Sequence, residues 1–507
     1  MSEILLSPGR DSIHSQIYRR LRDMIELGQL KAGQRVSSLR TMAVELGVAR
    51  GTVQVAYDRL LGEGYLVARG PAGTFVADGA ASRQRTRQTL QTPPKLALLP
   101  KPPASAAGRR PRWSASPQTH SDVQIESGGA APALFQLGLP ALDEFPRKLW
   151  TRLMARQVRM AHALTKPAPA GYGPLRAALT SYLHGSRGIA SEPAQLFVVP
   201  SYQAGLELTV NALGLIERTG SIRDRKAWVE TPGYPPTSQV LQHLGLSPCF
   251  VPVDEHGLDV DKARKAWPDA KMAVVTPSHQ SPTGVALSLP RRMSLLAWAA
   301  ENDGWIVEDD YDGEFRYRGH PLPALKSLDA SDRVIYCGTL SKVMYPGLRL
   351  AYLVVPTGLV SAFEIAAQRS THGGCPDLMQ ATVAEFIIDG HFSRHIRRMR
   401  ALYANRRSFL SEALKQYEHL GFTVRLQDGG MHLLLDVPAG SDDMAMAHHA
   451  RQAGFGIHAL SSWRGSAAGQ RALMLGFTNV GSALDADRHV KQLMDVLELL
   501  SLASPSS

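Results

Sequence analysis

A long stretch that cannot pack into a core divides this chain in two. Residues 79–130 are rich in Ala, Pro, Arg, Ser and Thr, with prolines at positions 93, 94, 100, 102, 103, 111 and 117. Such a composition buries too little apolar surface to offset the entropy of ordering the chain, and the prolines stiffen it. We therefore expect a linker between a small domain, residues 10–78, and a large one, residues 131–500.

The charge of the chain is concentrated ahead of the large domain. Residues 1–112 hold 18 Lys and Arg against 8 Asp and Glu, which accounts for +10 of the formal net charge of +11. A basic segment attached to a nearly neutral domain is typical of proteins that bind a polyanion such as nucleic acid. The alternative is a solvated basic arm that binds nothing.

Several classes of protein are disfavoured by the sequence. It contains no run of about 18 apolar residues and no signal-type segment, so we expect a cytoplasmic protein with no membrane partner. The three cysteines, Cys249, Cys337 and Cys375, are widely spaced and follow no zinc-ligand pattern. Neither a disulfide framework nor a metal site is expected.

The small domain has the pattern of a winged helix-turn-helix. Apolar residues at helical spacing predict a first helix, and two more are predicted at about 39–46 and 51–61, joined by a turn at Gly47. The segment YLVARGPAGTFVAD then predicts two short strands around a glycine-bearing turn. The apolar residues of the first helix are Ile13, Ile17, Leu21, Met24 and Ile25.

This geometry predicts which side chains would meet DNA. The third helix of such a domain enters the major groove, so Arg50, Thr52 and Gln54 are expected to meet bases or phosphates. Arg40 on the second helix, and Arg69 and Gly73 on the wing, are expected at the phosphate backbone. A three-helix module that binds protein is the alternative, because a fold alone does not fix a function.

The large domain is predicted to be α/β. From Phe135 onward, apolar runs such as LFVVP, KAWVE, KMAVVTP, WIVEDD, RVIYCG and LAYLVVP alternate with helix-like segments. That alternation is typical of a mostly parallel sheet covered by helices. Ligands of such sheets gather at the carboxyl ends of the strands.

Three residues at predicted strand ends suggest chemistry. Lys342 follows the strand RVIYCG, and Asp309 and Tyr311 share one face at the end of WIVEDD because strand side chains alternate. Pyridoxal phosphate needs an amine for a Schiff base, an anion beside its protonated ring nitrogen and a hydrogen bond to its ring hydroxyl. Lys342 would supply the amine, Asp309 the anion and Tyr311 the hydrogen bond. Taken singly, Lys342 reads as a surface lysine and Asp309 as a helix cap or a partner of arginine.

Other strand-to-helix steps supply the remaining parts of a pyridoxal phosphate site. Tyr234 in ETPGYPP is suited to stack on a ring, and TPSHQSPTG offers His279 and Gln280. Backbone N–H groups near Ser201, Tyr202 and Gln203 face the start of a helix, which favours phosphate.

Both domains resemble known families. The segment VSSLRTMAVELGVARGTVQVAYDRLLGEGYLVARGPAGTFV looks like the winged helix of GntR-family repressors. PSHQSPTG, EDDYDGEF, GTLSKVMYPGLRLAY and GHFSRHIRRMRALYANRR resemble fold-type I aminotransferases and, among them, the MocR or GabR-like regulators. Ser201 stands where relatives commonly have a phosphate-loop glycine.

This resemblance implies roles for the site residues. Lys342 would form the Schiff base with pyridoxal 5′-phosphate, Asp309 would hold the pyridine nitrogen, Tyr311 the ring hydroxyl, and Tyr234 would stack. Arg471, five residues before Gly476, would grip the carboxylate of an effector. The other cofactor-binding residues implied are Tyr202, Gln203, Gln280, Thr339, Ser341 and Arg349.

The resemblance also implies a function. It predicts a homodimeric regulator that binds double-stranded promoter DNA and senses pyridoxal phosphate or an amino compound, with transaminase activity absent or residual. One alternative is an active aminotransferase with an accessory DNA-binding domain. Another is a large domain that has lost its cofactor and serves only for dimerisation.

Overall fold

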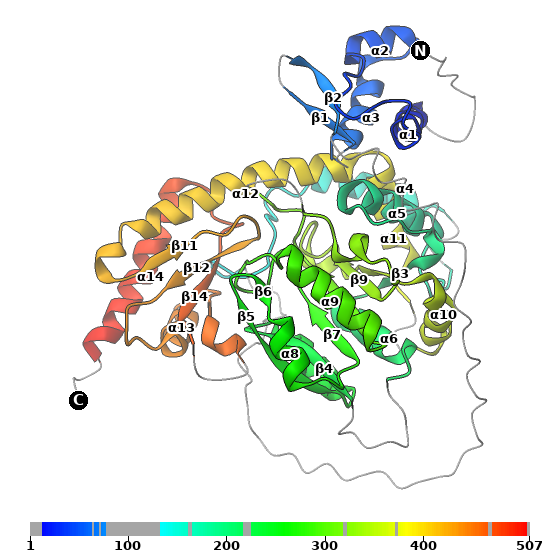
Figure 1. Ribbon diagram of the computed structural model, residues 1–507. Coiled ribbons are helices and arrows are strands. Elements are labelled where there is room, and N and C mark those ends of the chain that lie inside the picture. The colour runs from blue at the N-terminus through cyan, green and yellow to red at the C-terminus, as the bar shows by residue number, and fades with distance from the viewer. Residues whose placement is uncertain are drawn as a thin grey trace.

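The computed structural model describes residues 13–62, 65–69, 72–77, 132–160, 165–215, 225–317, 322–370, 374–464 and 469–503. The predicted linker, residues 79–130, lies outside these ranges. Two parts are described, which we call the head and the body. Figure 1 shows the head as the blue part above the body.

The head is the predicted winged helix-turn-helix. Its helices are α1 (Ile13–Glu26), α2 (Leu39–Glu45) and α3 (Arg50–Gly62), and its wing is the antiparallel pair β1 (Leu66–Ala68) and β2 (Thr74–Val76). Gly47 adopts a φ of +63° in the turn between α2 and α3, a conformation that favours glycine. The predicted apolar face of α1 is confirmed at Ile17, Leu21 and Ile25, which are buried, whereas Ile13 is exposed.

The body is built on an eight-stranded sheet in the order β3-β10-β9-β8-β7-β4-β5-β6. The strands β4, β5, β7, β8 and β9 are parallel, whereas β10 and β6 run antiparallel to their neighbours. This confirms the predicted α/β class. The bounds are β3 (Leu196–Val199), β4 (Lys226–Thr231), β5 (Ser247–Asp254), β6 (Gly257–Leu258), β7 (Met272–Val275), β8 (Trp305–Asp310), β9 (Val334–Thr339) and β10 (Ala351–Val354).

Helices cover both faces of this sheet, so its strands are apolar on both sides. One face packs against α6 (Tyr202–Ala212), α7 (Pro235–His243) and α10 (Val360–Arg369). The other packs against α5 (Gly173–Arg187), α8 (Val260–Ala266), α9 (Leu289–Glu301) and α11 (Asp377–Ile388). Helix α4 (Arg147–Gln157) packs on α11.

A smaller sheet lies beside the large one, on the left in Figure 1. Its strand order is β11-β12-β14-β13, and α13 (Asp443–Gln452) and α14 (Ala483–Ala503) pack on it. Its strands are β11 (Thr423–Arg425), β12 (His432–Asp436), β13 (His458–Ala459) and β14 (Ala472–Gly476).

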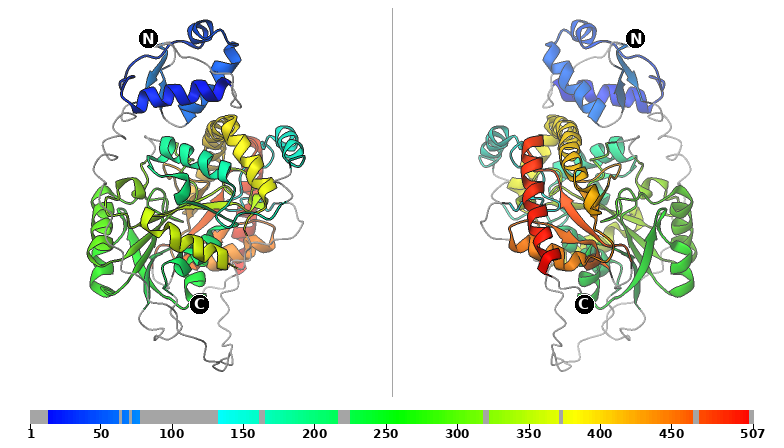
Figure 2. Two further views of the ribbon diagram at one scale, coloured as in Figure 1. Left: turned by 90° about the vertical axis from the view of Figure 1, so that its right-hand side faces the viewer. Right: turned by 90° about the vertical axis from the view of Figure 1, so that its left-hand side faces the viewer.

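One long helix links the parts of the molecule. Helix α12 (His391–Lys415) spans 25 residues, or about 37 Å at the rise of an α-helix. It contacts α3 of the head near its beginning and α14 of the smaller sheet farther on. Figures 1 and 2 show the head seated over this helix from three directions. In the part of the chain that the structure describes, no helix is long and apolar enough to cross a membrane.

Candidate functional site

The ends of neighbouring strands bring the predicted residues to one edge of the large sheet. Asp309 of β8 lies opposite Cys337 of β9 in the register, and Thr339 of β9 lies opposite Ala351 of β10. Ala351 in turn lies opposite Val199, the last residue of β3. Lys342 therefore follows β9 at the edge where β8 ends and α6 begins.

Lys342 is held close to the backbone of a distant segment. Its Nζ donates to the carbonyl of Gly138 at 3.0 Å. Burial lowers the pKa of the amine, and Asp312 and Asp309 partly counter that effect. A lower pKa favours the neutral amine, which is the form that attacks a carbonyl carbon.

Asp309 is a buried carboxyl group among other acids. Burial raises its pKa well above the usual range, and Asp310, Glu230 and Asp312 raise it further. Asp310 points to the other face of the sheet, where it accepts from Tyr336 at 2.7 Å, as strand alternation predicts. A cationic ring N–H beside Asp309 would stabilise its anion, so this environment fits a protonated pyridine.

Tyr311 belongs to a buried hydrogen-bonded network. Its hydroxyl lies 3.0 Å from Nδ1 of His279, which is 3.1 Å from Asp312. The other ring nitrogen of His279 lies 3.1 Å from Oε1 of Gln427. Asp312 raises the pKa of His279 against the effect of burial. The network fixes the phenol of Tyr311 at the sheet edge, where it can form a hydrogen bond with the hydroxyl of a ligand ring.

The predicted phosphate residues lie around the start of α6. Ser201 caps this helix, since its Oγ accepts from the N–H of Ala204 at 3.1 Å. The hydroxyl of Tyr202 lies 2.9 Å from Oγ1 of Thr237, and Gln203 follows in the first turn. A serine in place of glycine therefore caps the helix, and the helix still begins at the sheet edge.

Three more predicted residues lie at or after the end of β9. Oγ1 of Thr339 accepts from the N–H of Ser341 at 3.2 Å. Arg349 is exposed and has a φ of +52°. Burial and Asp309 raise the pKa of Tyr234 to about 12, and the nearby Arg349 partly counters them. The start of α6 and this arginine together provide positive potential for an anion.

A cavity of about 650 Å³ extends from this edge toward the smaller sheet. On the large-sheet side it is lined by Tyr202, Glu230, Tyr234 and Asp309 among others. The ring of Tyr234 lies 5.6 Å from that of Trp463 and 6.2 Å from that of Tyr202. Aromatic walls on both sides suit a flat ligand.

The far wall of the cavity is basic. It is formed by α13, β13 and the short helix η10 (Leu460–Trp463), and includes His448, Arg451, His458 and Arg464. Burial lowers the pKa of His458 to about 4, so this imidazole is neutral near pH 7. The two arginines provide the positive charge of this wall.

The structure does not bring Arg471 to the cavity. Arg471 is exposed just before β14, and its Nη1 donates to the carbonyl of Ser441 at 2.6 Å. Arg464 lines the cavity instead, next to Trp463.

Gln280 also lies elsewhere than predicted. Its amide nitrogen donates to Glu230 at 3.1 Å and to the carbonyl of Pro232 at 2.9 Å. Its oxygen accepts from the N–H of Thr283 at 3.0 Å. Both ends of the amide are thus engaged by protein groups, and Gln280 does not line the cavity.

The residues that sequence reasoning missed are mostly buried acids and their partners. Glu230 accepts from the N–H of Thr276 at 3.1 Å, and burial raises its pKa to about 7. Asp312 and Gln427 hold His279. The position of Asp312 in EDDYDGEF, just after β8, is the one sequence feature that could have identified it as a site residue. Gln427 lies far from His279 in the sequence, so no local pattern indicates their contact.

The predicted DNA-binding residues divide into two groups. Arg40, Arg50 and Arg69 are exposed, whereas Thr52 and Gln54 are half-buried. Gly73 has a φ of +107°, and a side chain there would meet Arg35. Gln54 donates to Asp58 at 2.9 Å. The exposed arginines lie on α2, α3 and the wing.

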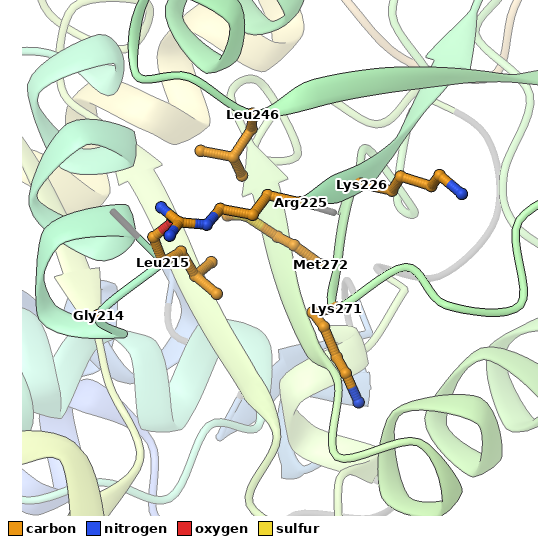
Figure 3. A pocket seen from close by; sticks show the side chains of 7 residues that line it. All are labelled: Gly214, Leu215, Arg225, Lys226, Leu246, Lys271 and Met272. Atoms are coloured by element: carbon orange, nitrogen blue, oxygen red, sulfur yellow. The ribbon is translucent and has the colours of Figure 1, made fainter. Parts of the chain in front are cut away.

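A second, smaller cavity lies at the opposite edge of the large sheet (Figure 3). Its volume is about 220 Å³. Its cations are already engaged: Arg225 donates to the carbonyl of Leu215 at 2.5 Å, Lys226 pairs with Asp269, and Lys271 donates to Asn302. It therefore offers no comparable site.

Comparisons with known proteins agree with both domains. Residues 151–465 match the family of aminotransferases of class I and II, and residues 13–76 match the gntR family of bacterial regulatory proteins. A kynurenine aminotransferase from Pyrococcus horikoshii, solved in complex with PMP, has a TM-score of 0.63 at 26% identity. The match covers 73% of this chain and 91% of the chain of that aminotransferase.

Curated relatives match over nearly the whole chain. The probable rhizopine catabolism regulatory protein MocR of Rhizobium meliloti is 34% identical over 92% of this chain and 90% of its own length. The pyridoxine biosynthesis transcriptional regulator PdxR of Corynebacterium glutamicum is 32% identical over 92% of each. The chain therefore belongs to the MocR-type transcriptional regulators, in which a GntR-family DNA-binding domain precedes an aminotransferase-like domain.

Proposed function

We propose that this regulator binds promoter DNA with its head and senses pyridoxal phosphate, or an amino compound bound with it, at the edge of the large sheet. The observation that carries the proposal is the grouping of Lys342, Asp309 and Tyr311 at that edge. The lysine amine, the buried carboxyl group and the phenol match what this cofactor requires.

Each residue has a separate task in this proposal. When bound, pyridoxal phosphate supplies an aldehyde that condenses reversibly with a primary amine. Lys342 provides that amine, and Asp309 holds a proton on the ring nitrogen. Tyr311, fixed by His279, bonds the ring hydroxyl, while Tyr234 covers the ring.

The phosphate end is assigned to the start of α6. Tyr202 and Gln203 lie in its first turn, and Thr339, Ser341 and Arg349 belong to the segments that flank it. Backbone N–H groups at a helix start, with an arginine nearby, bind phosphate well.

The chemistry of the effector follows from the far wall of the cavity. Arg464 and Arg451 supply positive charge, whereas the acids that line the cavity, Glu230 and Asp309, lie on the large-sheet side. An amino compound with an anionic group would place its amine near Lys342 and its anion toward Arg464. Guanidinium groups favour carboxylates through paired hydrogen bonds.

An active aminotransferase is the second candidate. The set of an amine, a ring-nitrogen carboxylate and a ring-hydroxyl donor that favours sensing is also compatible with catalysis. Release of a keto acid from an amino donor by purified protein, over many turnovers, would favour this second candidate.

We also propose that the regulator is a cytoplasmic homodimer. Soluble oligomers are most often symmetric dimers, and dimeric DNA-binding proteins read two half-sites. Sedimentation of the full chain would test whether it is a homodimer.

The first test is a visible absorption spectrum with added pyridoxal phosphate. Wild type should show a band of the bound cofactor that Lys342→Ala lacks, and Lys226→Ala, which changes a lysine at the opposite edge, should keep it. A DNA duplex to which wild type binds can be selected from a random pool. The affinity of wild type for this duplex should change when pyridoxal phosphate or an amine is added. Equal spectra for wild type and Lys342→Ala would contradict the cofactor assignment.

A further inference from the structure

The head docks on a defined surface of the body. We call this the docking surface; it consists of Ile388, Asp389, Gly390 and Arg397, at the end of α11 and the start of α12. Arg397 pairs with Asp58 of α3 at 3.1 Å, and Arg59 donates to the carbonyl of Ile388 at 3.3 Å. His14 of α1 lies 3.8 Å from Asp389.

The docking surface covers the second half of the outward face of α3, at Val55, Asp58 and Arg59. Val53, Ala56, Tyr57 and Leu60 of this helix are buried in the core of the head. At about 100° per residue, Val55 and Asp58 therefore point away from that core. The outward face of this helix is the one that a helix-turn-helix inserts into the major groove.

The contact also reaches a predicted DNA-binding side chain. Gln54 donates to Asp58 at 2.9 Å, and Asp58 pairs with Arg397. In this arrangement the side chain of Gln54 is held by the same carboxylate that joins the head to the body. While that hydrogen bond lasts, one N–H of its amide is used by Asp58 and is not offered to a base edge.

The packing leaves room for little more than one side-chain carbon between α3 and the start of α12. A side-chain carbon at Gly390 would lie 3.4 Å from Cγ1 of Val55 and 3.9 Å from Cβ of Arg59. The major groove is about 12 Å wide and admits one helix. DNA and the body cannot both occupy the outward face of α3 where the body contacts it, at Val55, Asp58 and Arg59.

We propose that the docking surface and DNA compete for α3, so that the docked chain is the form that does not bind its operator. The proposal rests on the proposed reading of DNA by α3. DNA binding would require the head to leave α12, and any ligand that favours departure would raise occupancy of the operator.

Helix α12 also touches the candidate site, which gives a ligand a physical route to the docking surface. Arg407 of α12 donates to the carbonyl of Gln427, whose side chain contacts His279. His279 in turn holds Tyr311. A ligand that moves this network would act on the helix that carries Arg397.

A reversible crosslink tests the competition directly. In Arg59→Cys/Gly390→Cys the two Cβ atoms would lie 3.9 Å apart, within the range of a disulfide, and the three native cysteines are buried. The oxidised protein should bind the wild-type-selected duplex at least about tenfold more weakly than the same protein after reduction.

Three results would overturn the proposal. Equal DNA affinity before and after reduction would mean that the docked head still reads DNA. Absence of a crosslink would mean that the head does not dock there, and a crosslink between two chains would mean that it docks on a second copy. If wild type enriches no duplex at all, the proposed DNA reading itself fails, which is a distinct outcome.

A charge reversal provides a second test that needs no disulfide. Arg397→Glu should weaken docking of the head and raise DNA affinity by about two- to fivefold, as expected for loss of one exposed ion pair. Arg398→Glu is the matched control, because the neighbouring Arg398 pairs with Glu144 of the body and not with the head. Equal effects of the two variants would contradict the proposal.

Discussion

Nε2 of His395 on α12 donates to the backbone carbonyl of Val343, the residue after Lys342, at 2.9 Å. The imidazole is buried, and burial lowers its pKa to about 4, so the ring is neutral near pH 7. A neutral ring can donate from one nitrogen while the other stays unprotonated. This bond ties the segment of the candidate lysine to the helix that supports the head.

Replacing His395 should therefore disturb both stability and cofactor binding. In His395→Leu the carbonyl of Val343 loses its donor in a buried setting, which costs about 1–3 kcal/mol of unfolding free energy. Urea unfolding of the body would measure this, and the affinity for pyridoxal phosphate should fall because the Lys342 segment is no longer fixed.

Two controls separate the hydrogen bond from packing. His395→Gln keeps a donor and should recover part of the stability and affinity, whereas His391→Leu changes a half-buried histidine one turn earlier and should leave cofactor affinity unchanged. If His395→Gln behaves like His395→Leu, the hydrogen bond is not the cause.

Glu230 should make stability depend on pH. Its pKa is about 7 in the folded chain, because of burial, against an ordinary value of 4.5. Because the pKa of Glu230 is higher in the folded chain than in the unfolded chain, protonation of this group stabilises the fold. That contribution to the free energy of unfolding is fully present below pH 4.5 and is lost as the pH rises to about 7. At about 1.4 kcal/mol per pKa unit, the loss approaches 3 kcal/mol.

The variant Glu230→Gln removes this titration. The difference in unfolding free energy between variant and wild type should rise in favour of the variant from pH 4.5 to 7, whatever its value at low pH. Chemical unfolding across this range checks it, and Glu412→Gln, an exposed change on α12, is the control. A difference that stays constant with pH would mean that the pKa of Glu230 is the same in the folded and the unfolded chain.

Gly138 should be needed to leave room for the lysine amine. A Cβ at this position would overlap Nζ of Lys342 and lie 3.1 Å from its Cε. Gly138→Ala should displace the amine and weaken cofactor binding. Gly214→Ala is a matched control, since its φ of +65° equals the +64° of Gly138 within a degree and a side chain there meets no atom within 4 Å.

The two variants share the backbone penalty of alanine at positive φ, so only the overlap with Lys342 differs. Absorption titrations with pyridoxal phosphate should show weaker binding for Gly138→Ala alone. Equal losses in both variants would assign the effect to backbone strain.

The strand-end residues could be predicted from the sequence because parallel strands bring their carboxyl ends to one edge. Lys342, Asp309, Tyr311 and Tyr234 each follow an apolar run, and the sheet register aligns those runs. The head could be predicted for a similar reason, since its helices and turn are determined by local patterns.

The remaining features depend on contacts between distant segments. Gln427 reaches His279 across 148 positions of sequence, and Asp58 meets Arg397 only because the head sits on α12. No local periodicity encodes such pairs. The same limit applies to the arginines, because spacing along the chain selects Arg471, whereas Arg464 is the one that lines the cavity.

The position of Arg464 on the cavity wall leads to a prediction about the effector. With pyridoxal phosphate present, wild type should bind L-alanine more tightly than isopropylamine, which has the same branched shape without a carboxylate. Arg464→Gln should reduce this preference by about tenfold or more, since a hydrogen bond to a charged group contributes about 1.5–3 kcal/mol. Arg471→Gln should leave it intact because Arg471 is exposed and turned to Ser441. Spectral titration with the two amines measures the ratio, and loss of preference in Arg471→Gln alone would restore the role that its position in the sequence suggests.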